Sequence, residues 1–404
     1  MSTTVRPTLL FWCQHSVGLG HLVRSLALAE ALQHDFEVVL LNGGPMPTGL
    51  TIPEGVEIVN LDPLGHDGGY ELVSRSSQVD VETAKRRRVA TILRALADRR
   101  PRVVLLELYP FGRKKFAFEM DPLLSAIDEL GVEAPKVVCS VRDILVNQRR
   151  DQARHDERAA LRSNEALDAI LFHADPTFAT LDESFRPRTP LRVPVYATGF
   201  VTAGASRPVA RPAVDERADR VIVSVGGGMV GEPIVRAAVA AHAAVAAATG
   251  LETLIVAGPF LPTPEWDWLV DQAERSCRLH VIRQVDDLAS EIAGSAVSVS
   301  QCGYNTTMDL LRAGTPAVVV PYSEGREDEQ RRRALRLQEL GIVHTVDPDE
   351  LTPERLTAAI VTAAGSPPPT VSLDLDGATA SARIVAELAG IDAPLGERKG
   401  LLTP

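Results

Sequence analysis

Short apolar runs alternate with longer segments of helical periodicity through the first half of the chain. Runs typical of buried strands lie at residues 8–13, 37–41, 103–108, 136–140, 168–172 and 192–197. A glycine loop follows the first run, and residues 21–32 carry the spacing of a helix. The stretch 42–70 is rich in Gly, Pro and Asp, and its length predicts a functional loop over a cleft. The alternation of strands and helices predicts a parallel α/β sheet.

The same alternation starts afresh after residues 202–218, a polar stretch with two prolines and no periodicity. We interpret this stretch as a linker. Beyond it, strands are predicted at 221–225, 253–257, 279–282, 296–300 and 317–320, with an Ala-rich helix at 234–248. The predicted domains are therefore two Rossmann-like units, residues 1–201 and 219–375, with a last helix near 380–389 inside a final segment, 376–404. Two such units facing each other place a cleft at the carboxyl ends of both sheets.

Composition narrows the class of protein. A chain of 404 residues with 45% hydrophobic residues has room for two full cores, and its net charge of −11 argues against nonspecific nucleic-acid binding. The four cysteines lie far apart, so neither a disulfide framework nor a zinc site is indicated. We find no signal-peptide pattern, and no apolar run reaches the roughly 18 residues that a membrane span needs. The cytoplasm is the expected location.

The segment 301–309 predicts a ligand site. It follows the buried strand 296–300 and reads as a turn that becomes a helix, with Gly303 in the turn and Asn305 or Thr306 as the cap. A helix N-terminus binds phosphate through its N–H groups and positive partial charge. Asp309, one turn along, can accept hydrogen bonds from sugar hydroxyls. One short segment could therefore hold both diphosphate and ribose.

This segment resembles the sugar-nucleotide box of inverting glycosyltransferases of the GT-B fold. The box reads HCGWNST-x-E in the family. The chain has Gln301 for the His, Tyr304 for the Trp, Thr306 for the Ser and Asp309 for the Glu, and the acid–Gln pair that ends the box falls at Glu329-Gln330. The second half resembles, more loosely, the peptidoglycan N-acetylglucosaminyltransferase. The resemblance implies two facing Rossmann-like domains, a C-terminal helix that crosses back onto the first domain, and donor contacts from Gln301, Cys302, Gly303, Asn305, Thr306, Thr307, Asp309, Glu329 and Gln330. An ordinary strand–turn–helix remains the alternative.

Two further segments of the second domain are candidates for donor binding. Gly226, Gly227 and Gly228 follow the strand 221–225, and glycines there allow a backbone to approach a diphosphate closely. Glycine is also common in ordinary turns of this type. Arg283 begins the loop that packs on the nucleotide base in the family, where backbone atoms often make the contact.

The first domain carries a candidate general base, His21, at the end of the loop that contains Gly18 and Gly20. A packed or capping histidine is the usual alternative. The loop resembles the Gly-His loop of plant-type glycosyltransferases, whose His is the base. It also resembles a sugar-nucleotide hydrolase with Gly-x-Gly-His followed by a hydrophobe, Met and Arg, where this chain has Leu22, Val23 and Arg24. An unperturbed pKa near 6.5 suits proton abstraction at neutral pH.

Other polar residues at strand ends complete the predicted acceptor side. Glu107 resembles the acid that orients the base in plant-type relatives, although a simple salt bridge to Arg113 is an alternative. Arg142 and Asp143 end another strand and either bind an acceptor or pair with each other. Residues 107–114 and 139–145 also resemble an uncharacterised bacterial branch of predicted glycosyltransferases.

Two runs of basic residues are expected to lie on helices without a role in ligand binding. Residues 85–88 (KRRR) are expected on the solvated face of a helix, with docking to an anionic membrane surface as the alternative. Residues 331–333 (RRR) follow acidic residues 327–329, and local i,i+4 ion pairs explain most of that run.

The sequence as a whole predicts an inverting GT-B glycosyltransferase that takes a nucleotide-diphosphate sugar, such as a UDP-sugar, as donor and transfers the sugar to a small-molecule or lipid-linked acceptor. No Asp-x-Asp motif is present, so neither a metal nor another cofactor is expected. Two alternatives remain, a nucleotide-sugar hydrolase of the same fold and a noncatalytic protein that binds sugar nucleotides.

Overall fold

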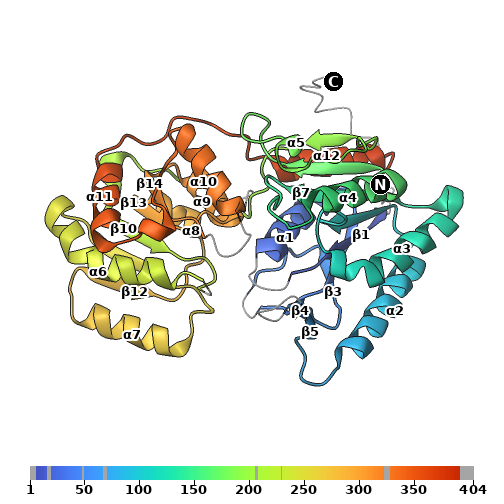
Figure 1. Ribbon diagram of the computed structural model, residues 1–404, viewed down its shortest axis with the longest axis horizontal. Coiled ribbons are helices and arrows are strands. Elements are labelled where there is room, and N and C mark those ends of the chain that lie inside the picture. The colour runs from blue at the N-terminus through green and yellow to red at the C-terminus, as the bar shows by residue number, and fades with distance from the viewer. Residues whose placement is uncertain are drawn as a thin grey trace, which may run out of the picture. The chain divides into compact units, whose positions relative to one another are not determined.

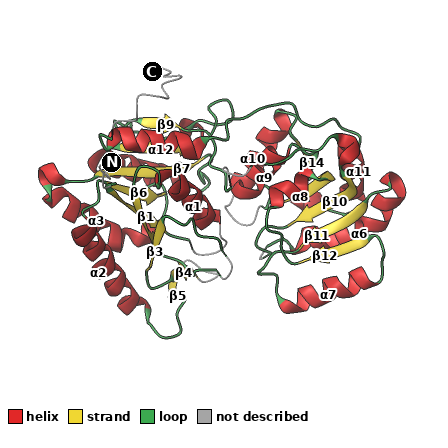
Figure 2. Cartoon of the chain, turned by 180° about the vertical axis from the view of Figure 1, so that it is seen from behind, coloured by secondary structure: helices red, strands yellow, loops and turns green. Residues whose placement is uncertain are grey.

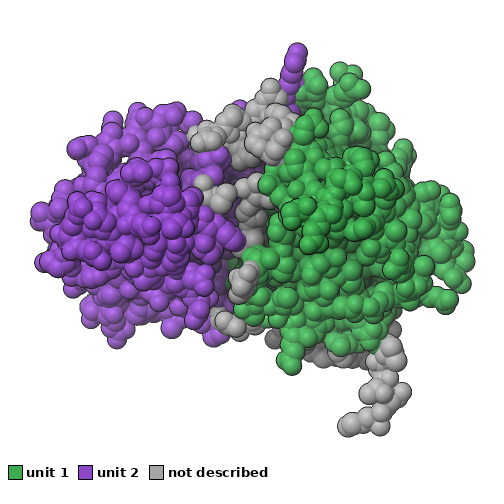
Figure 3. Space-filling view, turned by 90° about the horizontal axis from the view of Figure 1, so that it is seen from below, with its two compact units in different colours: residues 1–143, 151–203, 376–404 green, residues 144–150, 204–375 purple. Residues whose placement is uncertain are grey.

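The computed structural model describes residues 6–15, 20–47, 50–66, 71–204, 208–228, 230–322 and 328–391. The chain folds into two compact units, which Figure 3 colours separately. Unit 1 holds residues 1–143, 151–203 and 376–404, and unit 2 holds residues 144–150 and 204–375. Gly18, a predicted site residue, lies outside the described residues.

Unit 1 is built on a seven-stranded parallel sheet of order β3-β2-β1-β6-β7-β8-β9. The strands are β1 (Thr8–Cys13), β2 (Glu37–Asn42), β3 (Val56–Asn60), β6 (Val103–Glu107), β7 (Lys136–Arg142), β8 (Ala169–His173) and β9 (Val195–Ala197), with a separate hairpin of β4 (Leu64–His66) and β5 (Leu72–Ser74). The helices are α1 (Gly20–Leu32), α2 (Val81–Arg99), α3 (Ala117–Glu129), α4 (Gln152–Ala166), α5 (Leu181–Ser184) and α12 (Gly377–Leu388), with 3-10 turns at Lys114–Phe116 and Gly131–Glu133.

The two faces of this sheet follow the two-residue period of a strand. Leu9 and Phe11 of β1 enter the core that α1 and α12 cover, whereas Leu10 and Trp12 enter the core that α2 and α3 cover. Figures 1 and 2 both show α2 and α3 side by side on that second face. Because both faces are covered, the strands are apolar throughout rather than alternating.

The C-terminal helix α12 belongs to the core of unit 1. Val385 is fully buried there, and α12 packs along α1. Gly377 opens the helix so close to the backbone of Gly199 that an added Cβ would lie 2.3 Å from its carbonyl oxygen. Only glycine fits this approach.

Unit 2 repeats the plan with a six-stranded parallel sheet of order β12-β11-β10-β13-β14-β15. Its strands are β10 (Ala218–Ser224), β11 (Glu252–Val256), β12 (Leu279–Ile282), β13 (Ser295–Ser300), β14 (Ala317–Val319) and β15 (Val343–Thr345). Its helices are α6 (Glu232–Thr249), α7 (Thr263–Glu274), α8 (Leu288–Ala293), α9 (Tyr304–Ala313), α10 (Glu329–Glu339) and α11 (Pro353–Ala364), with 3-10 turns at Val214–Glu216 and Pro348–Glu350. The main core lies between the sheet and helices α6 and α11.

The two parallel sheets confirm the predicted α/β class, whereas two local predictions in unit 1 were wrong. The segment 42–70, expected to be a loop, contains β3 and β4. These strands were missed because short strands among Gly and Pro leave little periodicity in the sequence. The strand β15 was not predicted. In the run 85–88, Arg88 is fully buried rather than solvated, because its guanidinium binds both carboxylate oxygens of Glu119 at 2.6–2.7 Å. None of the helices in the described part of the chain is both long and apolar enough to span a bilayer.

Candidate active site

A histidine–carboxylate pair lies at the carboxyl end of β6 in unit 1. Glu107 is the last residue of β6, and His21 is the second residue of α1, the helix that follows β1. Nδ1 of His21 lies 2.6 Å from Oε1 of Glu107. Glu107 is fully buried, whereas the His21 side chain is 18% exposed. The fold therefore brings together the predicted base and its predicted orienting acid, from positions 86 residues apart.

Three cationic side chains also point to this carboxylate or its partner. Nη2 of Arg24 donates to Oε1 of Glu107 at 2.6 Å, and Nη2 of Arg113 lies 3.4 Å from Oε2. Arg24 stands one turn after His21 on α1, so both side chains lie on one helix face. Arg142, at the end of β7, is close enough to lower the pKa of His21. Asp143 beside it is buried.

The protonation states follow from burial and these charges. Burial is the largest influence on His21 and lowers its pKa to about 3, with help from Arg113 and Arg142 and against the opposing effect of Glu107. Burial alone would raise the pKa of Glu107, but His21, Arg113 and Arg24 outweigh it and hold that pKa below its usual value. At neutral pH the pair is therefore neutral imidazole beside carboxylate. Because the carboxylate accepts the proton on Nδ1, the other ring nitrogen, Nε2, carries none and can accept one.

The loop that follows β6 has an unusual backbone. Leu108 and Arg113 both have positive φ, 63° and 58°, a conformation that costs a non-glycine residue roughly 1 kcal/mol. Phe111 of this loop packs edge-on against Phe185 with ring centroids 4.9 Å apart. Arg113 of this loop lies within 3.4 Å of Glu107, which links the loop to the histidine–carboxylate pair.

In unit 2, the predicted phosphate-binding turn joins β13 to α9. Gly303, in an extended conformation, is the N-cap of α9 and makes no side-chain cap bond, so the predicted cap at Asn305 or Thr306 was wrong. Gly314 ends the helix in the left-handed conformation. Thr306 and Thr307 lie in the first turn of α9, where the hydroxyl of Thr307 is 3.6 Å from Sγ of Cys302. The cap of α9 is therefore the backbone of Gly303 and not a side chain.

Side chains from α10 fix that turn. Oε1 of Gln330 accepts hydrogen bonds from the backbone N–H groups of Cys302 and Tyr322, both at 3.1 Å. Arg333 is buried and donates to the carbonyl of Cys302 at 2.7 Å, while Arg331 pairs with Asp347. Glu329 is the first residue of α10. Gln330 of the acid–Gln pair therefore anchors the turn that precedes α9.

Asp309 is a carboxylate without a hydrogen-bond donor among the described residues. Burial raises its pKa to about 7, Asp287 adds to the rise, and Arg312 opposes it. Gln301, by contrast, is engaged, because its Nε2 donates to the carbonyl of Val230 at 3.0 Å. A half-buried acid that lacks donors gains from a ligand that supplies them.

The three glycines after β10 differ in what surrounds them. At Gly228 (φ 87°) an added Cβ would lie 2.6 Å from the carbonyl oxygen of Ala257, so this glycine lets two loops meet. At Gly227 a Cβ would lie 3.3 Å from the ring of Phe260. Gly226 (φ 56°) faces open space, which makes it the residue of the three that is available to a ligand.

Arg283, predicted in the donor site, has structural partners. Its Nη1 donates to the carbonyl of Leu261 at 3.1 Å, and its guanidinium lies 4.5 Å from the ring centre of Trp266. Among the described residues, no group of three His, Cys, Asp or Glu side chains is arranged to hold a metal ion.

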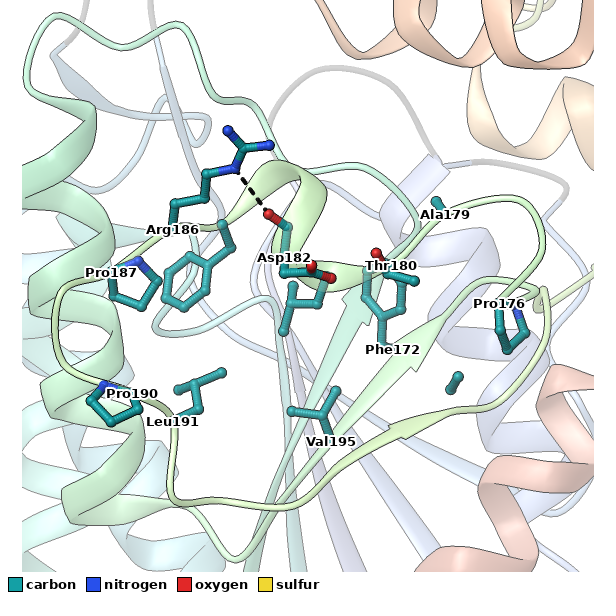
Figure 4. A pocket seen from close by; sticks show the side chains of 13 residues that line it. Phe172, Pro176, Ala179, Thr180, Asp182, Arg186, Pro187, Pro190, Leu191 and Val195 are labelled. Carbon is teal, nitrogen blue, oxygen red and sulfur yellow. Dashed lines mark hydrogen bonds between the residues drawn. The ribbon is translucent and has the colours of Figure 1, made fainter. Parts of the chain in front are cut away.

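Two features of unit 1 were not predicted from the sequence. One is the contact of Arg24 with Glu107, since Arg24 was named only as part of a resemblance. The other is a cavity of about 600 Å³ at β8 and β9, shown in Figure 4, which holds none of the predicted site residues. Its lining comes from Phe172, Val195 and the proline-rich turns around α5, and its rim carries Arg186, whose Nε donates to the carbonyl of Asp182. Most of the residues that line it come from the loops around α5, which have no periodicity, so no pattern marks them.

Known proteins resemble the chain at two levels. Residues 222–369 match the sequence model described as the glycosyltransferase family 28 C-terminal domain. An uncharacterized glycosyltransferase of Methanopyrus kandleri is 30% identical over 175 residues, which is 43% of this chain and 46% of the relative. A UDP-N-acetylglucosamine–N-acetylmuramyl-(pentapeptide) pyrophosphoryl-undecaprenol N-acetylglucosamine transferase of Exiguobacterium is 30% identical over 142 residues, 35% of this chain and 38% of the relative. The chain thus spans less than half the length of these curated relatives.

Solved structures share the fold over nearly the whole chain. A Medicago truncatula protein crystallised with UDP-glucose superposes with a TM-score of 0.60 at 14% identity, covering 95% of this chain and 99% of the other. The Acinetobacter baumannii MurG structure superposes with a TM-score of 0.55 at 17% identity, covering 94% and 100%. These likenesses confirm the predicted GT-B fold.

Proposed function

We propose, on the premise that residues 222–369 form a glycosyltransferase family 28 C-terminal domain in a chain of GT-B fold, that this protein transfers a sugar from a nucleotide-diphosphate sugar to an acceptor hydroxyl. The observation that carries the proposal is the match of the family model to residues 222–369 of unit 2, because the matched range includes the β13–α9 turn and Asp309. The structural relative crystallised with UDP-glucose supports a UDP-sugar as the first donor to test.

We assign the donor to unit 2. The N–H groups at the start of α9 would face the diphosphate, and the backbone at Gly226 would approach the same phosphates or the sugar. The ribose hydroxyls would donate to the carboxylate of Asp309, which lacks donors within the described residues. Gln330 would act on the donor indirectly, by holding the turn at Cys302.

We assign proton abstraction to His21 of unit 1. Nε2 of His21 would take the proton of the acceptor hydroxyl while that oxygen attacks the anomeric carbon of the sugar. The bond from that carbon to the diphosphate oxygen breaks, and the nucleoside diphosphate leaves with the electron pair. Glu107 would orient the imidazole and stabilise the imidazolium that forms. Direct displacement of this kind inverts the anomeric configuration.

The acceptor would bind to unit 1, near Gly20, Arg113, Arg142 and Asp143. Arg113 lies 3.4 Å from Glu107, so a group that binds it also reaches the histidine–carboxylate pair. We propose that the leaving diphosphate is stabilised by helix N–H groups and that no divalent cation is needed.

The test begins with the purified protein and a panel of UDP-, dTDP- and GDP-sugars in a thermal-shift screen. The nucleotide sugar with the largest shift is then offered with candidate hydroxyl acceptors, and nucleotide release and glycosylated product are measured, with His21→Ala as the inactive control. Product that appears only with acceptor supports the transferase. Stoichiometric release of free sugar without acceptor would identify a hydrolase, and binding without turnover under any condition would indicate a noncatalytic binding protein.

A further inference from the structure

One carboxylate oxygen of Glu107 serves two side chains at once. Oε1 accepts from Nδ1 of His21 and from Nη2 of Arg24, each at 2.6 Å. Arg24 is 2% exposed and Glu107 is fully buried, so water does not compete for this oxygen. The geometry therefore makes Arg24 a direct determinant of where the carboxylate points and how much of its charge the imidazole experiences.

A carboxylate beside an imidazole raises the affinity of the ring for a proton, because it stabilises the cation. A guanidinium on the same oxygen offsets that charge and adds its own repulsion. Short charge-assisted bonds of this kind also fix the rotamer of the acid. Both effects favour an imidazole that is held in place yet stays neutral.

We propose that Arg24 is a positioning residue, which aims Glu107 at His21 and keeps the imidazole in its neutral, proton-accepting form well into the acid range. This inference rests on the proposed role of His21 as the base. It goes beyond that role, since it predicts that transfer does not fail at mildly acidic pH, where an ordinary histidine would be protonated.

The charged surroundings agree with the proposal. Burial, Arg113 and Arg142 lower the pKa of His21 to about 3 against the opposing effect of Glu107. Arg24 is one of the cations that hold the pKa of Glu107 below its usual value, so it keeps the acid ionised and its Oε1 engaged.

Three buried groups near the pair, two cysteines and a histidine, stay uncharged between pH 5 and 8. Burial raises the pKa of Cys13 on β1 to about 12 and raises that of Cys139 on β7. Burial lowers the pKa of His173 on β8, whose two ring nitrogens contact the hydroxyls of Ser140 and Thr198 at 2.8 and 2.9 Å. The pH response of this site is therefore a property of His21, Glu107 and the arginines.

Arg24→Gln keeps a donor for Glu107 and removes the charge, whereas Arg24→Lys keeps the charge. The measurements are the single-turnover rate at saturating donor from pH 5 to 8 and the NMR titration of the His21 ring protons over the same range. Arg162→Gln, which removes a surface arginine paired with Asp121 in the same unit, is the matched control.

In the wild type, we expect ring protons that do not titrate and a rate that stays within about twofold from pH 8 to pH 5. In Arg24→Gln, the acid limb should rise by about three pH units to near pH 6, so that His21 titrates inside the window and the rate at pH 5 falls approximately tenfold. Arg24→Lys should restore most of the wild-type profile, and nucleotide affinity should not change in either variant.

A rate loss in Arg24→Gln that is equal at every pH, with His21 still silent by NMR, would show a merely structural role and overturn the proposal. If Arg24→Gln does not fold, the wild-type titration decides alone, because a His21 that titrates near pH 6.5 contradicts the inference. The NMR result does not depend on turnover, so failure of the proposed transferase activity remains distinguishable from failure of this inference.

Discussion

Replacing Asp309 by asparagine separates what its carboxylate does for a nucleotide from what it does to the fold. The side chain is of similar size, but it carries no charge and cannot accept two charge-assisted hydrogen bonds. If ribose hydroxyls donate to this carboxylate, Asp309→Asn should weaken binding of the nucleotide sugar by about 1.5–3 kcal/mol, which is about 10- to 150-fold in Kd.

The effect on stability should have the opposite sign. The pKa of Asp309 is raised from 3.8 to about 7, so the folded state prefers the protonated acid. Its stabilising contribution is therefore fully present near pH 4 and is lost as the pH rises through 7. The rise corresponds to at most about 4 kcal/mol, and partial exposure of the side chain reduces it. We expect Asp309→Asn to be about 1–2 kcal/mol more stable than the wild type at pH 8 and equal to it near pH 4.

Calorimetry with UDP-glucose, or with the nucleotide sugar that gives the largest thermal shift, measures the first effect. Urea unfolding at pH 4.5 and pH 8 measures the second. Asp271→Asn is the matched control, because Asp271 pairs with Arg275 on the exposed face of α7 and should change neither quantity by more than about 0.5 kcal/mol. Unchanged affinity together with lower stability at pH 8 would refute the reasoning, since it would mean that Asp309 has a structural partner and no nucleotide.

Three further outcomes are expected. Gly226→Ala should weaken nucleotide-sugar binding at least about tenfold in calorimetry and lower the free energy of unfolding by about 1–2 kcal/mol. Gly250→Ala, at a left-handed glycine that also faces open space at the end of α6, should cost a similar unfolding free energy and leave binding unchanged. Equal affinities in the two variants would make the Gly226 turn purely structural. His21→Ala should lower the single-turnover rate by roughly 10² to 10⁴ with unchanged donor affinity, and because the pKa of His21 is about 3, the wild-type rate should lose its base only below about pH 4; a variant with the wild-type rate would end the assignment. Arg88→Met should destabilise unit 1 by about 3–5 kcal/mol in urea unfolding, since it leaves Glu119 buried and unpaired, and a loss below 1 kcal/mol would show that the pair is dispensable.

The sequence was sufficient for those parts of the fold in which local pattern and tertiary structure agree. Apart from β3 and β15, the parallel strands lie in both units close to their predicted bounds, because a strand buried on two faces is apolar throughout. The loop 42–70 was misread because β3 and β4 are short and lie among turn residues. Gly303 became the cap of α9 because Gln330, from a helix further along the chain, fixes the backbone before Asn305 is reached.

The residues of the candidate site could be named from the sequence, but most of the contacts between side chains could not. His21 and Glu107 each follow a strand, and the carboxyl edge of a parallel sheet brings such residues together. Arg88 was expected to face solvent because nothing near it in the sequence marks its partner. That partner, Glu119, lies on another helix 31 positions away. Arg24 was seen only as part of a resemblance, because a basic residue on an amphipathic helix gives no sign of whether it faces solvent or a buried acid.

The place of α12 has a consequence for how the chain is made. The core of unit 1 needs Ala382 and Val385, which are synthesised after all of unit 2. On a ribosome, unit 2 can therefore close before unit 1, although unit 1 is synthesised first. Until residue 388 has emerged, α1 displays an uncovered apolar face, so the nascent chain carries an aggregation-prone surface throughout the synthesis of its second half. A single short helix therefore allows the second unit of the chain to complete its fold before the first.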